Sequence, residues 1–289
     1  MTVATVTVAM PVYNGGRELH LAVQSILDQS FTDWELVIVD DGSTDDAVSE
    51  LASLAEPRIR IFADGQNRGL AARLNQIIGL SRAPLIARMD HDDIAHPERL
   101  ARQVEFLAAH PEIDLLGTRC LSMSETERII GELPFAETHA DICHRPWLGF
   151  YLAHPSWMGR AAWFRRHAYA NPAPYCCEDQ ELLLRASARS HFHALPDALL
   201  AYRVRAKVPF RKLFRTRAAM ARAQLGYFAS HQRYGDAVLA VAAFLARTSS
   251  DVGREVFPRL RSDIRSEQGK TEDWDAVIAG VQSKLHRTR

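Results

Sequence analysis

The first 120 residues alternate between short apolar runs and amphipathic stretches, which limits the possible folds more than any other feature of the sequence. Apolar runs rich in β-branched residues predict strands at 3–10, 35–39, 59–62 and 85–89, and a fifth strand from 115. Apolar residues three and four positions apart predict helices at 19–27, 48–54, 70–80 and from Pro97. This alternation is typical of a doubly wound, mostly parallel sheet with helices on both faces.

Three of the predicted strands end in polar sequence, at 11–14, 40–43 and 90–93. Ligands of open α/β sheets bind at the carboxyl ends of the strands. We therefore expect these three clusters to lie on one edge of the sheet.

The cluster Asp90-His91-Asp92-Asp93 holds three carboxylates in four residues. Such carboxylates repel one another unless a cation or hydrogen bonds compensate. A hard divalent ion, Mg²⁺ or Mn²⁺, would bridge them to substrate phosphates. The alternative is an acidic loop that caps the helix beginning at Pro97, and the position at a strand end favours the metal site.

The second half of the chain has a less regular pattern. It predicts a hairpin at 129–133, a helix at 178–188, and short strands at 192–195 and 199–204. The chain is predicted to be helical from Phe210 onward. The polar segment 261–289 is expected to be loosely ordered.

The charges cancel over the 289 residues, with 35 Lys and Arg against 35 Asp and Glu, but they are unevenly distributed. Acids gather around 40–46 and 90–93, and arginines gather from 203 to 222. An acidic site beside a basic stretch suits a metal-chelated polyphosphate, although a solvated helix face also explains such a run. Nucleic-acid binding is not expected, because there is no excess of positive charge and no recognised motif.

The stretch 211–222 combines arginines with apolar residues. A basic amphipathic helix of this kind can lie on anionic lipid, which would suit a lipid-linked acceptor. Packing of its apolar residues against the core, with the arginines in water, explains the pattern as well.

The cysteines, Cys120, Cys143, Cys176 and Cys177, show neither zinc spacing nor a disulfide framework, so reduced thiols are expected. Because a strand signal begins within a few residues of Met1, no secretory signal is expected. The apolar run 237–246 is too short to span a bilayer. A cytoplasmic location is expected, with possible peripheral contact at the inner face of the membrane.

Four segments resemble, in order, the signatures of the family 2 glycosyltransferases: Pro11–Asn14, Val39–Asp45, Asn67–Gly69 and Arg88–Asp93. The resemblance extends over roughly residues 3–205. It implies the GT-A fold and an inverting reaction. On this basis 1–208 is expected to form the GT-A domain, with a nucleotide-binding half at 1–120 and an acceptor half at 121–208, and 209–289 a helical C-terminal extension.

The resemblance implies a role for each matching acid. Asp90 and Asp92 resemble the DxD pair of the family: Asp92 is expected to ligate Mn²⁺ or Mg²⁺, and Asp90 to contact the ribose of the donor or the metal. Asp41 resembles the carboxylate that recognises the base, commonly uracil. His91 occupies the variable position and is not expected to be a ligand.

Four further residues are expected around the nucleotide by the same resemblance. Pro11 and Tyr13 would line the nucleoside pocket. Asn67 and Arg68 lie in the segment that closes over the nucleotide.

Glu178-Asp179 resembles the Glu-Asp pair of the family, in which Asp179 matches the catalytic base. An inverting transfer needs such a base to deprotonate the acceptor hydroxyl, whereas two acids at a helix start are also common N-terminal residues. His154, in a His-Pro-Ser segment, is expected either to contact a sugar or to be structural.

Tyr202-Arg203-Val204 resembles the closing strand of the family, after which relatives often place a His at the position of Arg205. Because that His is absent, Arg203, Arg205 or Lys207 is expected to stabilise the departing diphosphate.

The resulting hypothesis is an inverting, metal-dependent transferase. It would move a sugar from a nucleotide diphosphate sugar, expected to be a UDP-sugar, to a saccharide or lipid-linked saccharide acceptor in surface polysaccharide synthesis. One alternative is a non-catalytic, nucleotide-sugar-binding scaffold subunit of a polysaccharide assembly complex. Another is a nucleotidyltransferase, which would usually show a Gly-rich, basic phosphate loop after the first strand that this sequence lacks.

Overall fold

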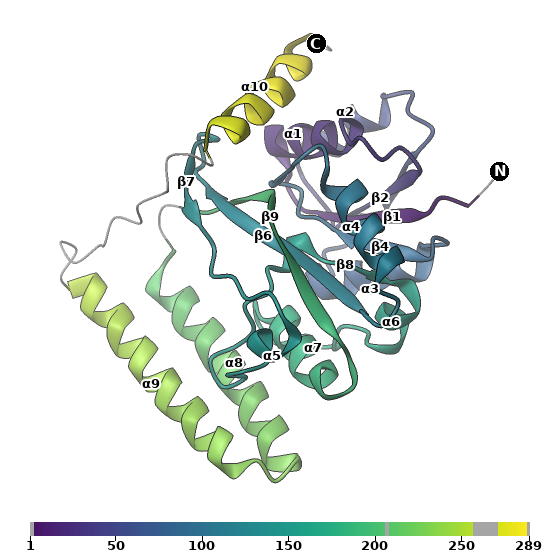
Figure 1. Ribbon diagram of the computed structural model, residues 1–289. Coiled ribbons are helices and arrows are strands. Elements are labelled where there is room, and N and C mark those ends of the chain that lie inside the picture. Colours follow the sequence, from purple (N-terminus) through teal and green to yellow (C-terminus); the bar gives the residue numbers. More distant parts are fainter. Residues whose placement is uncertain (1–2, 206–207, 257–270, 288–289) are drawn as a thin grey trace.

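The computed structural model describes residues 3–205, 208–256 and 271–287. Within these residues the strands are β1 (Val6–Val12), β2 (Trp34–Asp40), β3 (Ile59–Ala63), β4 (Leu85–Arg88), β5 (Ile94–Ala95), β6 (Leu115–Met123), β7 (Ile129–Glu132), β8 (Met158–Arg160) and β9 (Phe192–Arg203). They form one sheet in the order β3-β2-β1-β4-β8-β6-β9-β5, with β7 paired to β6 (Figure 1).

The first four strands are parallel to one another, as the sequence predicts. β1 continues two residues beyond its predicted end, through Pro11. The carbonyl of Val12 accepts from the amide of Asp41 on the β2 side, so the backbone of Pro11 faces the β4 side. Pairing with β4 ends at Ala9. Proline has no backbone N–H to donate, and at position 11 the β1–β4 ladder does not require one.

The second half makes the sheet mixed. β8 runs antiparallel between β4 and β6, and β9 runs parallel to β6. The two strands predicted at 192–195 and 199–204 are one strand, whose register against β6 shifts near Arg119. β5 and β8 are two and three residues long, too short to give a periodic signal in the sequence.

The helices are α1 (Gly16–Leu27), α2 (Ala47–Ala52), α3 (Leu70–Leu80), α4 (Arg99–Ala109), α5 (His139–Ile142), α6 (Ala161–Arg166), α7 (Glu178–Ala186), α8 (Phe210–Ser230), α9 (Tyr234–Val256) and α10 (Thr271–Arg287), with 3₁₀ turns at His154–Ser156 and Ser187–Arg189. Apolar residues of α1, α2 and α4 pack on one face of the sheet, and those of α3, α6 and α7 on the other. The predicted α/β fold with helices on both faces is therefore confirmed.

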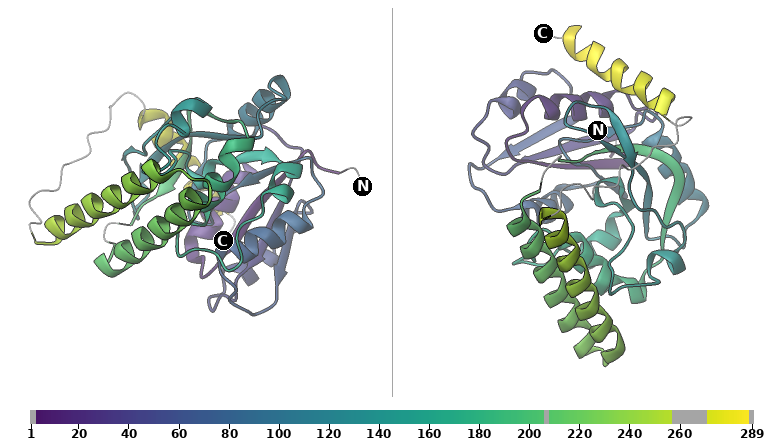
Figure 2. Two further views of the ribbon diagram at one scale, coloured as in Figure 1. Left: turned by 90° about the horizontal axis from the view of Figure 1, so that it is seen from below. Right: turned by 90° about the vertical axis from the view of Figure 1, so that its left-hand side faces the viewer.

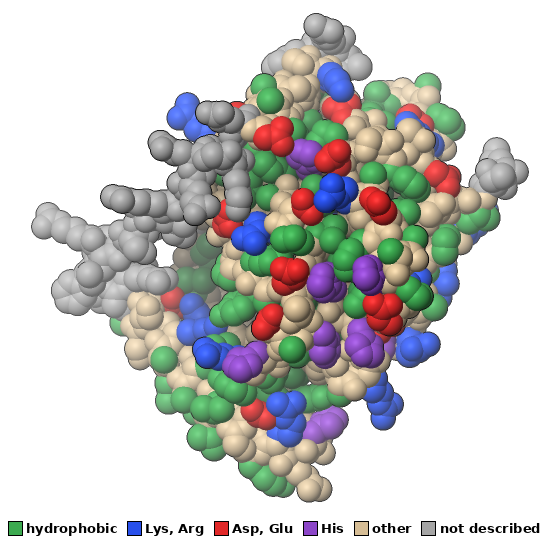
Figure 3. All heavy atoms as spheres, in the orientation of Figure 1, with side chains coloured by type: hydrophobic (Ala, Val, Ile, Leu, Met, Phe, Trp, Pro, Cys, Tyr) green, Lys and Arg blue, Asp and Glu red, His purple; other side chains and the backbone are tan. Residues whose placement is uncertain are grey.

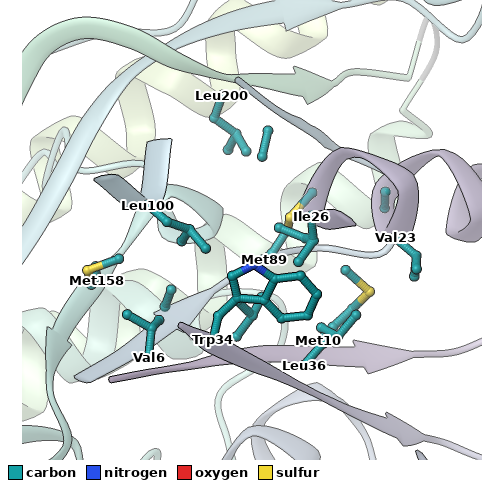
Figure 4. Close-up of a cluster of buried hydrophobic side chains, with 14 of the residues drawn as sticks. Val6, Met10, Val23, Ile26, Trp34, Leu36, Met89, Leu100, Met158 and Leu200 are labelled. Atoms are coloured by element: carbon teal, nitrogen blue, oxygen red, sulfur yellow. The ribbon is translucent and has the colours of Figure 1, made fainter. Parts of the chain in front are cut away.

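Trp34 lies at the centre of the core on the α1 side (Figure 4). It is 2% exposed, and Met10, Ile26 and Met89 lie around it. Replacing a tryptophan buried to this extent by alanine costs about 3–5 kcal/mol. This core fixes β1, β2 and β4, the three strands whose ends carry the polar clusters.

The C-terminal extension has two parts. α8 and α9 form a long helical hairpin that projects beside the domain (Figures 1 and 2). α10 packs near α1 on the other side of the molecule, where Trp274, Ile278 and Val281 are buried.

The expectation of a loosely ordered tail is wrong for 271–287. Trp274, Ile278 and Val281 recur at helical spacing and bury an apolar stripe against β6 and α1. The indole of Trp274 also donates to the carbonyl of Ala198 at 3.2 Å. Residues 261–270 and 288–289 of that expectation lie outside the described residues.

Candidate active site

A cavity of about 1030 Å³, called here the large cavity, opens at the carboxyl edge of the sheet. Its wall comes from the loop after β4, the start of α3, the loop 170–174, the end of β9 and the start of α8. Of the residues expected to bind the donor, Arg68, Asp90 and Asp92 line it.

The acids after β4 have separate environments. Asp90 and Asp92 face the large cavity, and Arg88 donates to Asp90 Oδ1 at 2.5 Å. Asp93 is buried, and its Oδ1 accepts from the amide of Arg203 at 2.9 Å. Asp93 thus fastens the loop to β9, which leaves two carboxylates for a ligand.

Burial raises the pKa of the Asp92 carboxyl, and the neighbouring Asp90 raises it further. A bound cation would relieve both effects. Within the described residues there is no cluster of three His, Cys, Asp or Glu side chains able to hold a metal. Mg²⁺ is commonly held by one or two carboxylates with substrate phosphates and water as the other ligands, and Asp90 and Asp92 fit that donor set.

Asp41 is buried and holds the loop after β3 in place. Its Oδ1 accepts from the amide of Arg68 at 2.6 Å and from Arg73 Nε at 2.8 Å, and its Oδ2 accepts from the amide of Gly69 at 3.0 Å. An ionised carboxylate has about four acceptor positions. Asp41 therefore positions the loop, and these three groups occupy three of its four acceptor positions.

The ends of β1 and β2 are tied together. The amide of Asn14 donates to Ser43 Oγ at 2.9 Å, and Asn14 Oδ1 accepts from the amide of Thr44 at 2.8 Å. Tyr13 is 48% exposed beside this link, whereas Pro11 is buried in β1. The three clusters thus meet at one edge, as predicted.

The loop after β3 approaches the loop after β2 closely. Asn67 and Arg68 are both exposed there. Gly42 has a φ of +77°, and a Cβ on it would lie 3.0 Å from the carbonyl carbon of Gln66. A larger residue at Gly42 would push the loop away from the strand ends.

The cations near the large cavity differ in how they are used. Arg203 is 9% exposed, and it donates to the carbonyl of Asp92 at 2.8 Å and to Glu127 Oε1 at 3.2 Å. Arg205 and Lys212 are exposed and line the cavity. Arg203 is therefore placed to position the Asp92 loop, and Arg205 and Lys212 to meet an anion. Lys207 lies outside the described residues.

The two acids at the start of α7 face different spaces. Glu178 lines the large cavity, whereas Asp179 lines a second cavity of about 300 Å³, called here the small cavity. Burial raises the pKa of Glu178 to about 7, with a further contribution from Asp179. Burial also raises the pKa of Asp179, while hydrogen bonds from Gln180 oppose the rise.

His154 lies beneath the site. It is 8% exposed, and its Nε2 is 2.7 Å from the hydroxyl of Tyr169. Burial lowers its pKa well below the usual range, and the charge of Arg88 adds to the effect. These contacts favour the structural interpretation of His154.

Two arginines matter here to which the sequence pattern assigned no role. Arg73 is fully buried between Asp41 and Asp64. Arg88 is 3% exposed and holds Asp90. The signal was a charged residue within an otherwise apolar helix face or strand, where a buried charge requires a partner.

The sheet and the charged cavity at its edge define an α/β protein suited to a charged ligand at the strand ends. The sequence model of Glycosyl transferase family 2 matches residues 7–168, more than half of the chain, so the chain belongs to this family. The putative glycosyltransferase EpsE of Bacillus subtilis is 38% identical over 123 residues, covering 42% of this chain and 44% of EpsE. The chain thus matches less than half of EpsE.

Two solved structures show the same GT-A fold. TarS of S. aureus, solved in complex with UDP-GlcNAc, has a TM-score of 0.60 at 19% identity, over 76% of this chain and 66% of that one. The mannosyltransferase PcManGT of Pyrobaculum calidifontis, in complex with GDP-Man and Mn²⁺, has a TM-score of 0.55 at 16% identity, over 98% and 87%. At these identities the likeness establishes the fold alone.

Proposed function

We propose that the protein is an inverting glycosyltransferase that uses a nucleotide diphosphate sugar, most simply a UDP-sugar. The acceptor would be a saccharide or lipid-linked saccharide of a surface polysaccharide. The observation that carries the proposal is the large cavity, whose wall includes Asp90 and Asp92 at a strand end together with Arg205 and Lys212, in a family 2 chain. Paired acids and cations in one cavity suit a metal-bound diphosphate.

In this proposal the nucleoside lies along the ends of β1 and β2. Asp41 accepts from the base, and Pro11, Tyr13, Asn67 and Arg68 form the surrounding surface. The fit of Asp41 is supported by its remaining acceptor position. One structural neighbour is bound to UDP-GlcNAc and the other to GDP-Man, so the choice of base is left to experiment.

Asp92, with Asp90, would hold Mn²⁺ or Mg²⁺, and Asp90 would also contact the ribose. When bound, the metal would neutralise charge on the departing diphosphate. Arg205 and Lys212 would add to this stabilisation, because positive charge favours a leaving group that gains negative charge.

Asp179 would be the general base. Its carboxylate would take the proton of the acceptor hydroxyl while that oxygen bonds to the anomeric carbon and the nucleoside diphosphate departs with the electrons of the broken bond. Its position on the small cavity, behind Glu178, would keep the base apart from the leaving group.

A donor panel tests the proposal. Incubation with UDP-, GDP- and TDP-sugars and Mn²⁺ should release nucleoside diphosphate from one donor class. Binding with no turnover of any donor, even by hydrolysis, would support the scaffold alternative. Release of pyrophosphate instead would identify a nucleotidyltransferase.

The domain bounds remain part of the proposal: a GT-A domain at 1–208, with halves at 1–120 and 121–208, and an extension at 209–289. The family match ends at 168, but β9 pairs with β6 along its length. A truncation after 208 should therefore keep the sheet intact, which circular dichroism would check.

We also propose peripheral contact of the hairpin with an anionic bilayer. No helix in the described part of the chain has the length and apolar character needed to cross a membrane. α8 contains five arginine and lysine residues and no acid, and Phe214, Val238 and Leu245 are 42%, 69% and 57% exposed. On the face that Figure 3 shows, acidic and basic side chains are otherwise interspersed.

Sedimentation with vesicles tests this contact. Binding is expected to phosphatidylglycerol vesicles, to weaken in high salt, and to be lost in a Val238→Asp/Leu245→Asp variant. The matched control is Val3→Asp, which alters an exposed apolar residue far from the hairpin. Self-association without vesicle binding would show that a second copy covers this face instead.

A further inference from the structure

The small cavity lies between the α/β domain and the helical hairpin formed by α8 and α9. Its domain side is the loop 147–149 and the start of α7, which includes Asp179. Most of its remaining wall comes from α8 and α9, including Met220, Gln224, Ala243 and Arg247. The C-terminal extension therefore encloses the space that the proposed base faces.

The hairpin also fixes the loop that carries Trp147. Gln224 on α8 donates to the carbonyl of Pro146 at 2.7 Å, and Arg247 on α9 donates to the carbonyl of Leu148 at 2.8 Å. Gln224 is 3% exposed, and a buried amide without a partner would cost about 1–3 kcal/mol. Two helices that lie far from this loop in the sequence thus hold the carbonyls of Pro146 and Leu148 in place.

A third contact joins this loop to the proposed base. Gln180 accepts from the amide of Phe150 at 2.8 Å and donates to Asp179 Oδ2 at 3.1 Å. Gly149 has a φ of +100°, and a Cβ on it would lie 2.7 Å from Gln180 Oε1. Gln180 therefore holds the loop and the Asp179 carboxylate together. The backbone conformation and the close approach of Gln180 require glycine at position 149.

The hairpin is itself braced at the cavity. Arg217 on α8 makes two hydrogen bonds to Asp251 on α9, at 2.5 and 3.0 Å, and Asp251 is 8% exposed. Arg217, Thr216 and Cys176 line both cavities. The two spaces thus adjoin at α8, with Glu178 facing one and Asp179 the other.

The size and lining of the small cavity suit one sugar ring. Its volume of about 300 Å³ equals roughly ten molecules of liquid water, comparable with the twelve non-hydrogen atoms of a hexose. Trp147, Asp179 and Arg247 line the small cavity. They would offer an aromatic side chain for the C–H face of the ring and polar groups for its hydroxyls. Apolar walls with few polar groups are typical of small-molecule sites.

We propose that the α8–α9 hairpin completes the acceptor site, with Gln224 and Arg247 as positioning residues that hold Trp147 and Asp179 around one acceptor sugar. This inference rests on the proposed transfer reaction, and it assigns acceptor selection to residues beyond the matched family region 7–168. The extension then determines which sugar is glycosylated, while the strand ends determine the donor.

The test replaces Arg247 by Met, which keeps the stem and removes the donor to Leu148. The acceptor probes are p-nitrophenyl α- and β-glycosides of glucose, galactose, mannose and N-acetylglucosamine. The acceptor KM and glycoside Kd should rise about tenfold, as expected for one lost hydrogen bond. The donor KM and the rate of donor hydrolysis without acceptor should change less than twofold.

Three variants complete the test. Arg247→Lys should restore most of the acceptor affinity. Ala243→Leu should fill the small cavity and weaken glycoside binding at least tenfold with the donor KM unchanged. Arg222 is an exposed residue of α8 outside this cavity. The variant Arg222→Met is therefore the matched control and should behave as wild type.

An unchanged acceptor KM in both Arg247→Met and Ala243→Leu would overturn the inference. It would also be overturned if the donor KM and the rate of donor hydrolysis changed as much as the acceptor KM. Absence of binding of every glycoside to the wild type would also overturn it. Failure of the proposed function is distinguishable, because it would appear as no nucleoside diphosphate release from any donor while glycoside binding still depended on Arg247.

Discussion

The large and the small cavity adjoin, yet they are built in different ways. The large cavity carries many charged groups, such as Asp90, Asp92, Arg205 and Lys212, most of them close to strand ends. The small cavity has fewer charged side chains in its wall, namely Asp179, Arg217 and Arg247, and most of that wall comes from a helical hairpin. Charged ligands are recognised by charges at a sheet edge, whereas a sugar ring needs a shaped, partly apolar surface.

In the reaction that we propose, this difference separates donor binding from acceptor binding. The strand ends are fixed by the core of the sheet, so the proposed donor site there would be rigid. The hairpin contacts the domain through hydrogen bonds such as those of Gln224 and Arg247, and through buried apolar residues such as Phe228. An acceptor site built in this way can vary in sequence while the donor side stays the same.

The largest expected effect concerns the boundary between the cavities. Asp179→Asn should lower transfer by about 10³-fold, since a positioned general base contributes roughly 10²–10⁴, with donor affinity within twofold of wild type. Transfer rates and donor binding measure this. Glu178→Gln is the matched variant and should retain transfer within tenfold. A large loss of transfer in Glu178→Gln with a small loss in Asp179→Asn would identify Glu178 as the base. The base would then lie in the large cavity together with the proposed donor site.

The next effect tests the large cavity alone. Asp92→Ala should weaken nucleoside diphosphate binding in the presence of Mn²⁺ about 100-fold, because the metal loses a carboxylate, and should leave glycoside binding unchanged. Calorimetric titration measures both. Asp46→Ala, which removes an exposed acid outside the cavity, is the control. Unchanged affinity for the diphosphate in Asp92→Ala would contradict the metal assignment.

The smallest effect concerns Glu178. Its pKa is raised from an ordinary 4.5 to about 7, mainly by burial and then by Asp179, so folding favours the protonated form. The resulting stability is present below pH 4.5 and is lost as the pH rises through 7. Between pH 5 and pH 8 the free energy of unfolding should therefore fall by roughly 2.5 kcal/mol from this group.

Glu178→Gln should remove that fall and be more stable than wild type at pH 8, with little difference at pH 5. Urea unfolding at the two pH values measures it. Glu181→Gln on the same helix is the control, since Glu181 is paired with Arg185. An equal pH dependence in wild type and Glu178→Gln would show that Glu178 is not buried as a neutral acid.

Much of the fold could be predicted because β1 to β4 and the helices between them have local periodic patterns. Short elements such as β5 and β8 gave no such pattern and depend on partners distant in sequence. The helical character of α10 agrees with the prediction for the chain from Phe210 onward, but its packing was not expected because its sequence is polar overall. Its buried stripe of Trp274, Ile278 and Val281 depends on β6 and α1, which cover it.

For the site, the sequence by itself determined the acids Asp90 and Asp92 and their place at a strand end, because a strand and the loop that follows it are neighbours in the chain. The tertiary structure decided that Asp93 turns inward, that Asp41 holds a loop through Arg73, and that Glu178 and Asp179 face different cavities. It also decided the place of the α8–α9 hairpin. These features depend on contacts between segments far apart in the chain, and local patterns do not record them.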